Sequence, residues 1–244
     1  MQSKLWLVSA CALTVGLLAS SGSAYSADLG GPRGGMKDGP VVERSVPTWT
    51  GFYAGIQSGY TWGNADHSFG TGGMIVPGMT ANSAPDGLIY GGHVGYNLQS
   101  GSIVYGIEAD LEGGDVRGGF AITPVGGGRG DAELNWQGSV RARLGYVDGS
   151  ALFYATAGWV IGGFDFGGGP AGAPLIDGYS KMRNGWTIGA GAEWMLSRRL
   201  TMRIEYRYAD YGEASGLLLP TYGHVYMPVD LDTHTVRAGL SLRF

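Results

Sequence analysis

Apolar and polar residues alternate along the last ten residues of the chain. One side of this segment would carry Val236, Ala238, Leu240, Leu242 and Phe244, and the other would carry Thr235, Arg237, Gly239, Ser241 and Arg243. Alternation with a period of two predicts a β-strand, whose successive side chains point to opposite faces. The same period recurs in seven earlier segments, more weakly where glycine is frequent. The predicted strands cover residues 50–63, 88–99, 103–111, 134–147, 151–166, 186–196, 200–208 and 235–244.

The length of these segments and their aromatic residues indicate a membrane protein. A tilted strand crosses a bilayer in roughly 9 to 11 residues, which is close to the length of most predicted strands. In segment 186–196, Trp186 and Trp194 stand near the two ends of the apolar face, and outer-membrane strands place aromatic residues at both membrane interfaces. After residue 24 the chain has no uninterrupted apolar run of about 18 residues, the length that a transmembrane helix needs.

The connections between the predicted strands alternate in length. Three are short, at residues 100–102, 148–150 and 197–199, and four are long and rich in glycine and proline, at 64–87, 112–133, 167–183 and 212–233. Outer-membrane barrels have short periplasmic turns and long outer loops, and a spanning sheet must close because lipid cannot satisfy an open edge. We therefore expect an all-β fold, an eight-stranded antiparallel up-and-down transmembrane β-barrel with both ends in the periplasm.

The N-terminal part has a different composition from the strands. Residues 1–24 have the basic, apolar and small-residue regions of a secretory signal peptide, with Ala27 as an alternative cleavage point. Residues 28–48 read as a flexible periplasmic leader, and the barrel is predicted over 49–244. The single cysteine, Cys11, lies in the predicted signal peptide, so the mature chain would have no thiol. The formal net charge of -4 gives no electrostatic footprint for nucleic acid.

Charged residues gather on the faces predicted to point inward. Both signs occur at similar depth, and buried charges must be paired in a narrow interior. An ionic plug is the favoured interpretation, because small barrels are generally filled by side chains. A gate or narrow selective conduit is the alternative. The predicted interior cluster contains Glu108, Asp110, Arg141, Arg143, Glu193, Arg203, Glu205, Arg207 and Arg237, with Arg243 further along the last strand.

The residues that could carry catalysis or metal binding are scattered. His67, His93, His224 and His234 show no spacing typical of metal ligands. Some eight-stranded outer-membrane barrels are enzymes that use a histidine and a serine two residues apart on one strand, and no histidine here has that neighbour. We predict no catalytic residue, no metal and no cofactor. The tripeptide Arg129-Gly130-Asp131, placed in the second long connection, is an adhesion-type motif.

Several motifs together resemble one protein family. They are WTGFYAG at 49–55, VRARLGY at 140–146, EYRY at 205–208 and VRAGL at 236–240. In this order they resemble the small porin-family outer-membrane β-barrel proteins of alphaproteobacteria, which are related to the OmpA-like transmembrane barrel. The resemblance implies an integral protein of the outer membrane of a Gram-negative cell that contacts outer-membrane lipid. It also implies that the terminal Phe244 is the signal read by the outer-membrane assembly machinery.

These observations favour a structural surface barrel with a filled, charge-paired interior and long extracellular loops. A small diffusion channel for ions or small solutes is the first alternative. A loop-mediated adhesin that binds a host or surface ligand is the second.

Overall fold

The computed structural model describes residues 48–71, 74–122, 128–170, 177–218 and 225–244. The predicted signal peptide and the leader up to residue 47 lie outside this part of the chain. In the described residues the chain forms antiparallel strands only, and no helix there could span a membrane. The strands are β1 (Gly51–Thr71), β2 (Met74–Ser83), β3 (Asp86–Ser100), β4 (Ile103–Ile122), β5 (Gly128–Asp148), β6 (Ala151–Pro170), β7 (Asp177–Met195), β8 (Leu200–Leu218) and β9 (Val225–Arg243).

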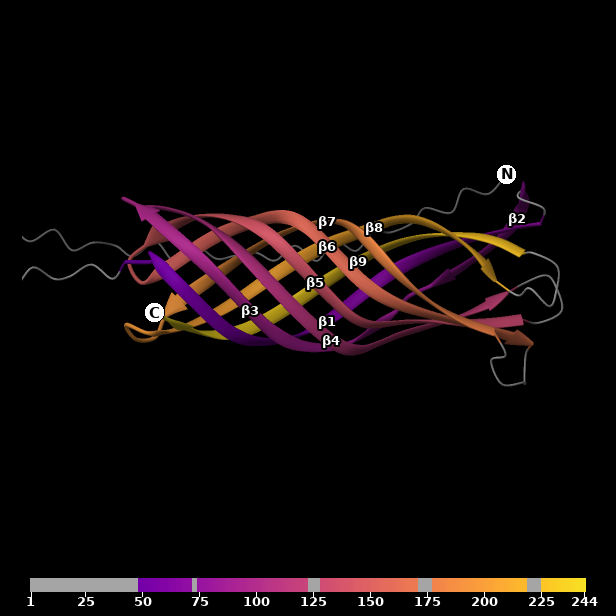
Figure 1. The fold of residues 1–244 in the computed structure, drawn as a ribbon, viewed down its shortest axis with the longest axis horizontal. Helices are drawn as coiled ribbons and strands as arrows, with labels where there is room; N and C mark the ends of the chain where they lie inside the picture. Colours follow the sequence, from indigo (N-terminus) through magenta and orange to yellow (C-terminus); the bar gives the residue numbers. More distant parts are fainter. Residues whose placement is uncertain (1–47, 72–73, 123–127, 171–176, 219–224) are drawn as a thin grey trace, which may run out of the picture. The chain divides into compact units, whose positions relative to one another are not determined.

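The sheet closes into a barrel of eight strands (Figure 1). From β3 to β9 each strand pairs with the next, and β1 pairs with both β3 and β9. β2 and β3 together occupy one strand position of the barrel, because β1 pairs with β3 up to Trp62 and with β2 from Ala65 onward. Between β2 and β3 the strand is interrupted at Ala84 and Pro85, where the Gly63 amide donates to the Pro85 carbonyl at 2.9 Å. The predicted fold class is confirmed.

The three short connections lie at one end of the barrel, which we call the turn end. Gly101 and Gly149 each begin a two-residue loop with a φ near 60°, and tight hairpins require a positive φ at that position. At the third connection, the amides of Leu196 and Ser197 both donate to the Leu200 carbonyl. All three predicted short turns are confirmed.

The long connections are shorter than predicted, because the strands continue toward the other end, which we call the loop end. β4 and β5 stay paired up to Ile122 and Gly128, with a register shift between Gly113 and Val116. The tripeptide Arg129–Asp131 therefore lies in β5, and its predicted position in a loop was wrong. Register shifts mark the start of this extension, including one between Asp210 and Glu213. There Gly212 adopts a φ of 63°, as in a bulge that adds one residue to a strand.

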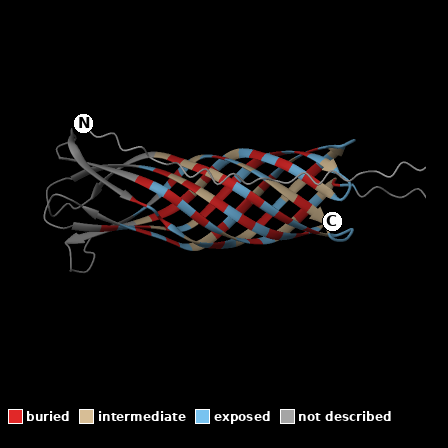
Figure 2. Ribbon diagram, turned by 180° about the vertical axis from the view of Figure 1, so that it is seen from behind, coloured by how far each residue is buried: buried red, intermediate tan, exposed pale blue. Residues whose placement is uncertain are grey.

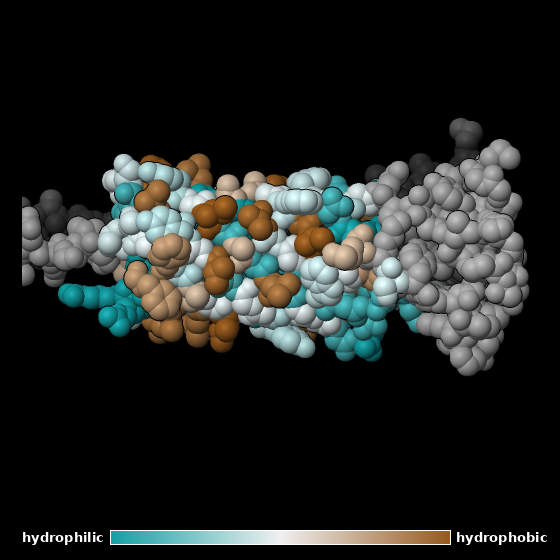
Figure 3. All heavy atoms as spheres, in the orientation of Figure 1, coloured by the Kyte–Doolittle hydropathy of each residue, from teal (hydrophilic) through white to brown (hydrophobic). Residues whose placement is uncertain are grey.

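The two faces of the wall differ sharply in chemistry. Buried and exposed residues alternate along each strand (Figure 2), and large apolar side chains stand on the outer wall (Figure 3). On β9, Leu240 is 44% exposed and Ala238 also faces outward. Arg237, at the alternate position, faces inward and is only 1% exposed. The predicted facing of the last strand is therefore confirmed.

Aromatic residues bound the outward apolar band along the strands. Outward residues nearest the turn end include Phe52, Tyr105, Tyr146 and Phe153, and those toward the loop end include Trp62, Trp136, Trp159 and Trp186. Beyond the second group most outward positions are polar, as at Asp115 and Asp131, although Met182 on β7 is exposed there as well. This order matches the two aromatic girdles expected at the interfaces of a bilayer.

Candidate functional site in the barrel interior

On the inward face of the described strands, ten charged side chains are joined to one another by ion pairs, and we call this set the charge network. It contains the nine predicted interior residues and, in addition, Glu112. Each side chain is buried. Five carboxylates meet five guanidinium groups, so the formal charges of this set cancel. The network consists of Glu108, Asp110, Glu112, Glu193 and Glu205 with Arg141, Arg143, Arg203, Arg207 and Arg237.

Arg141 and Arg237 form the centre of the charge network. Arg141 donates to Glu205 at 2.5 Å, to Glu108 at 2.6 Å and to Asp110 at 2.8 Å. Arg237 reaches Glu205 at 2.6 Å and Asp110 at 3.3 Å, and it donates to Glu112 at 2.6 Å. Since these residues come from β4, β5, β8 and β9, the two arginines connect walls on different sides of the barrel.

The outer members of the network add further pairs. Arg203 donates to Glu108 at 2.6 Å, and Arg207 donates to Glu112 at 2.7 Å. Arg143 pairs with Glu193. A buried ion pair repays the cost of desolvation only when its geometry is good and extra hydrogen bonds satisfy the remaining atoms.

Neutral side chains supply those extra hydrogen bonds. Each donates to a network carboxylate, and each is buried. They are Tyr53 to Glu108 at 2.8 Å, Gln57 to Glu112 at 2.5 Å, Gln137 to Glu112 at 2.9 Å, Ser139 to Asp110 at 2.7 Å, Tyr154 to Glu205 at 2.9 Å and Thr201 to Glu193 at 2.5 Å. The carboxylates are thus held by neutral donors as well as by arginines.

Glycines opposite the charged residues leave room for the network. Gly59 pairs with Arg237, and a Cβ at Gly59 would lie 2.7 Å from the Arg237 Cβ. Gly158 pairs with Arg141, and a Cβ there would lie 2.6 Å from the Arg141 Cα. An eight-stranded barrel is only wide enough for its side chains. This need for space explains the frequent glycines that weaken the alternation in the first, second and fifth predicted strands.

An apolar layer lies on the loop-end side of the charge network. Its side chains are buried and come from successive strands around the barrel. Tyr211 links it to the polar residues, because its hydroxyl donates to Gln137 at 2.7 Å. The Tyr211 ring meets the Phe164 ring edge-on at a centroid distance of 5.0 Å. The layer includes Ile89, Val116, Leu134, Phe164, Tyr211 and Leu231.

A second apolar cluster, the turn-end plug, lies on the other side of the network. It contains Trp49, Val104 and Leu152, with the ring of Tyr154. The Trp49 amide donates to the Gln99 side chain at 2.7 Å. Side chains therefore occupy the interior in three successive layers, a mostly apolar layer, the charge network and the turn-end plug. The first of these also holds the buried Arg183, whose guanidinium lies over the Phe164 ring at 5.9 Å.

Arg243, predicted on the inward face, lies outside the charge network, and one network residue, Glu112, was missed in the sequence. The Arg243 guanidinium stacks over the Trp49 ring at 5.1 Å. Phe244 is 82% exposed, and its amide donates to the Phe52 carbonyl. Glu112 was assigned to a loop, although it continues the period of two from Glu108. The role of Phe244 as an assembly signal stays a prediction.

The described histidines do not gather into a metal site. His93 is buried in the interior, with its Nε2 2.7 Å from the Ser241 Oγ. His234 faces outward, near Asp232 and stacked on Trp62. The side chains of His67 and His224 are outside the described part. In that part no group of three His, Cys, Asp or Glu residues could hold a metal ion.

A family model and two relatives from other bacteria identify the type of protein. A family model described as "Outer membrane protein beta-barrel domain" matches residues 42–244. The "31 kDa outer-membrane immunogenic protein" of Brucella melitensis is 33% identical over 84% of this chain and 90% of its own length. The "22 kDa outer membrane protein" of Rhizobium leguminosarum is 31% identical over 85% and 83%. Among solved structures, the outer membrane protease OmpT from Escherichia coli aligns with a TM-score of 0.46 and 11% identity over 80% of this chain and 97% of that chain.

Proposed function

The chain belongs to the outer membrane protein β-barrel domain family and is located in the outer membrane, and on this premise we propose that it is a closed structural barrel. It would stabilise the membrane and present its loop end at the cell surface. The observation that carries this proposal is the interior: a charge network of balanced sign between two apolar layers.

The contacts inside the barrel favour a plug over a conduit. A path for ions through the centre would require Arg141 and Arg237 to release carboxylates from several strands at once. Removing one partner of a buried ion pair costs about 3 to 5 kcal/mol. Solutes would then also have to pass the apolar layers around Phe164 and Trp49.

The orientation follows from the two ends. We place the turn end in the periplasm and the loop end outside, as short periplasmic turns and longer outer connections are usual in this class. The Brucella relative carries the word immunogenic in its name, which supports surface display of the loop end in this chain as well. We propose no enzymatic activity, because the hydrogen-bonded pair of His93 and Ser241 is buried in the barrel interior, away from solvent.

Single-channel recording tests this proposal. The full mature chain, refolded and inserted into a planar lipid bilayer, is expected to show no stepwise conductance. A porin inserted under the same conditions serves as the positive control for the bilayer and electronics. Reproducible conductance steps from the folded protein would contradict the plug and favour a small diffusion channel.

A further inference from the structure

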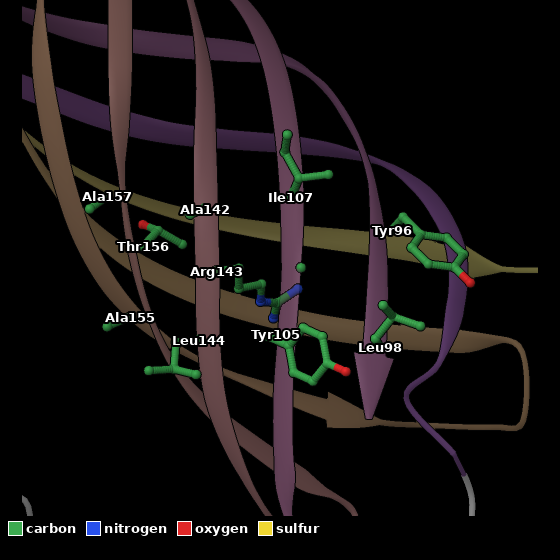
Figure 4. Close-up of a pocket in the computed structure, with 11 residues that line it drawn as sticks. Tyr96, Leu98, Tyr105, Ile107, Ala142, Arg143, Leu144, Ala155, Thr156 and Ala157 are labelled. Atoms are coloured by element: carbon green, nitrogen blue, oxygen red, sulfur yellow. The ribbon is translucent and has the colours of Figure 1, made fainter. Parts of the chain in front are cut away.

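The outer wall carries a groove across β3, β4, β5 and β6. Its volume is about 560 Å³, which is within the usual range for sites that bind small molecules. Figure 4 shows Tyr96, Leu98 and Tyr105 on one side of it and Ala155 and Ala157 on the other. Most of the side chains that line the groove are apolar.

The groove exists because small residues meet in the cross-strand register. Ala142 pairs with Ala157, and Leu144 pairs with Ala155. Directly opposite residues point to the same face of a sheet, so these positions form a shallow floor. On the next strand Ile107 pairs with Ala142 and rises beside this floor.

The position of the groove determines what can fill it. It lies on the outward apolar band, between Tyr105 near the turn end and Trp159 toward the loop end. This band is the surface that contacts membrane lipid, and the groove is continuous with it. Apolar contact between two protein copies gains little in a bilayer, because lipid tails are as apolar as the side chains. A hydrocarbon chain is therefore a better match than a second barrel.

We propose that this groove is a binding site for one acyl chain of a glycerophospholipid. In the orientation given above, it lies in the half of the membrane nearer the periplasm, so the lipid would come from the periplasmic leaflet. The hydroxyl groups of Tyr96 and Tyr105, at the turn-end side of the groove, are the polar atoms available to the ester or headgroup region.

Native mass spectrometry of the full mature chain tests the site. The protein is released from detergent micelles that contain palmitoyl-oleoyl phosphatidylethanolamine, and the bound lipids per barrel are counted. The double variant Ala155→Leu with Ala157→Leu fills the groove. The matched control is Ala238→Leu, an outward alanine on β9 outside the groove. We expect the wild type and the control to retain one lipid, and the double variant to retain at least fivefold less.

The experiment separates lipid binding in the groove from dimerisation and from misfolding of the variant. Equal lipid retention by the wild type and the double variant would overturn the proposal. So would a dimer of the wild type that disappears in the double variant without any change in bound lipid, which would identify a second copy as the occupant. Heat-modifiable gel mobility checks that each variant folds. If the double variant does not fold, Ala142→Leu fills the same floor from β5 and is held to the same criterion.

Discussion

Replacing Arg237 by methionine removes a guanidinium from the centre of the charge network. Arg237 contacts Glu112 and Glu205 at 2.6 Å each and Asp110 at 3.3 Å. Methionine is shorter than arginine, but it replaces the aliphatic stem and so keeps the packing of that part of the side chain. The variant therefore leaves five carboxylates with four arginines, in an interior where each group is buried.

The magnitude follows from the partners that remain. Breaking a buried ion pair costs about 3 to 5 kcal/mol when one charge is left uncompensated. Here Glu205 keeps Arg141 at 2.5 Å, and Glu112 keeps Arg207 at 2.7 Å. We therefore expect a loss near the lower limit, about 3 kcal/mol of unfolding free energy.

Reversible urea unfolding in lipid vesicles, followed by tryptophan fluorescence, measures this loss. Arg117→Met is the matched control, because the Arg117 side chain is 66% exposed and its ion pairs with Asp115 and Glu133 face water. Exposed pairs contribute about 0 to 1 kcal/mol, so the control should unfold close to the wild type.

A double-mutant cycle then tests the pairing itself. Glu205→Gln combined with Arg237→Met restores equal numbers of charges, and we expect a coupling energy of about 1 to 3 kcal/mol between the two sites. If Arg237→Met and Arg117→Met lost the same small amount of stability, the buried ion pairs of Arg237 would not stabilise the barrel. Additive effects of Glu205→Gln and Arg237→Met would refute the assigned contact.

Three further predictions concern the wall, the glycines and the plug. Leu240→Arg puts a charge on the lipid face and should cost about 2 to 4 kcal/mol if the site lies near the bilayer centre; Leu240→Ala is the control, and normal vesicle insertion of the arginine variant would contradict the facing. Gly59→Ala should destabilise the barrel by about 1 to 3 kcal/mol through overpacking, whereas Gly113→Ala, where the nearest atom would be 3.6 Å away, should unfold like the wild type. Trp49→Ala should cost about 3 to 5 kcal/mol in the same urea titration, and an unchanged midpoint would show that the turn-end plug adds no stability.

The sequence predicted the side of the wall on which nine of the ten charge-network residues lie, and it missed Glu112. A strict period of two separates Arg237 from Leu240, and burial of one and exposure of the other follow directly. The short turns were equally clear, because Gly101 and Gly149 stand between two alternating segments. These features depend on residues close together in the chain.

The partners inside the barrel could not be read in the same way. Arg141 and Glu205 are 64 residues apart, and only the stagger of the strands around the barrel brings them together. The extensions of β4 and β5 were missed because glycines interrupt the alternation there, while backbone pairing to the neighbouring strand continues. The break between β2 and β3 at Pro85 was also missed. It is bridged by a backbone hydrogen bond from the Gly63 amide, which leaves no side-chain pattern in the sequence.

The accessibility of the interior to water-soluble reagents tests the closed barrel most directly. Cys11 is the only cysteine and lies in the predicted signal peptide, so single cysteines can be placed in the mature chain at Thr156, buried in the interior, and at Ser150, exposed in a turn. A charged methanethiosulfonate is then added to the folded protein in vesicles. We expect rapid labelling of Ser150→Cys, and labelling of Thr156→Cys only after the protein is unfolded in urea. Equal labelling rates at the two positions in the folded barrel would contradict it.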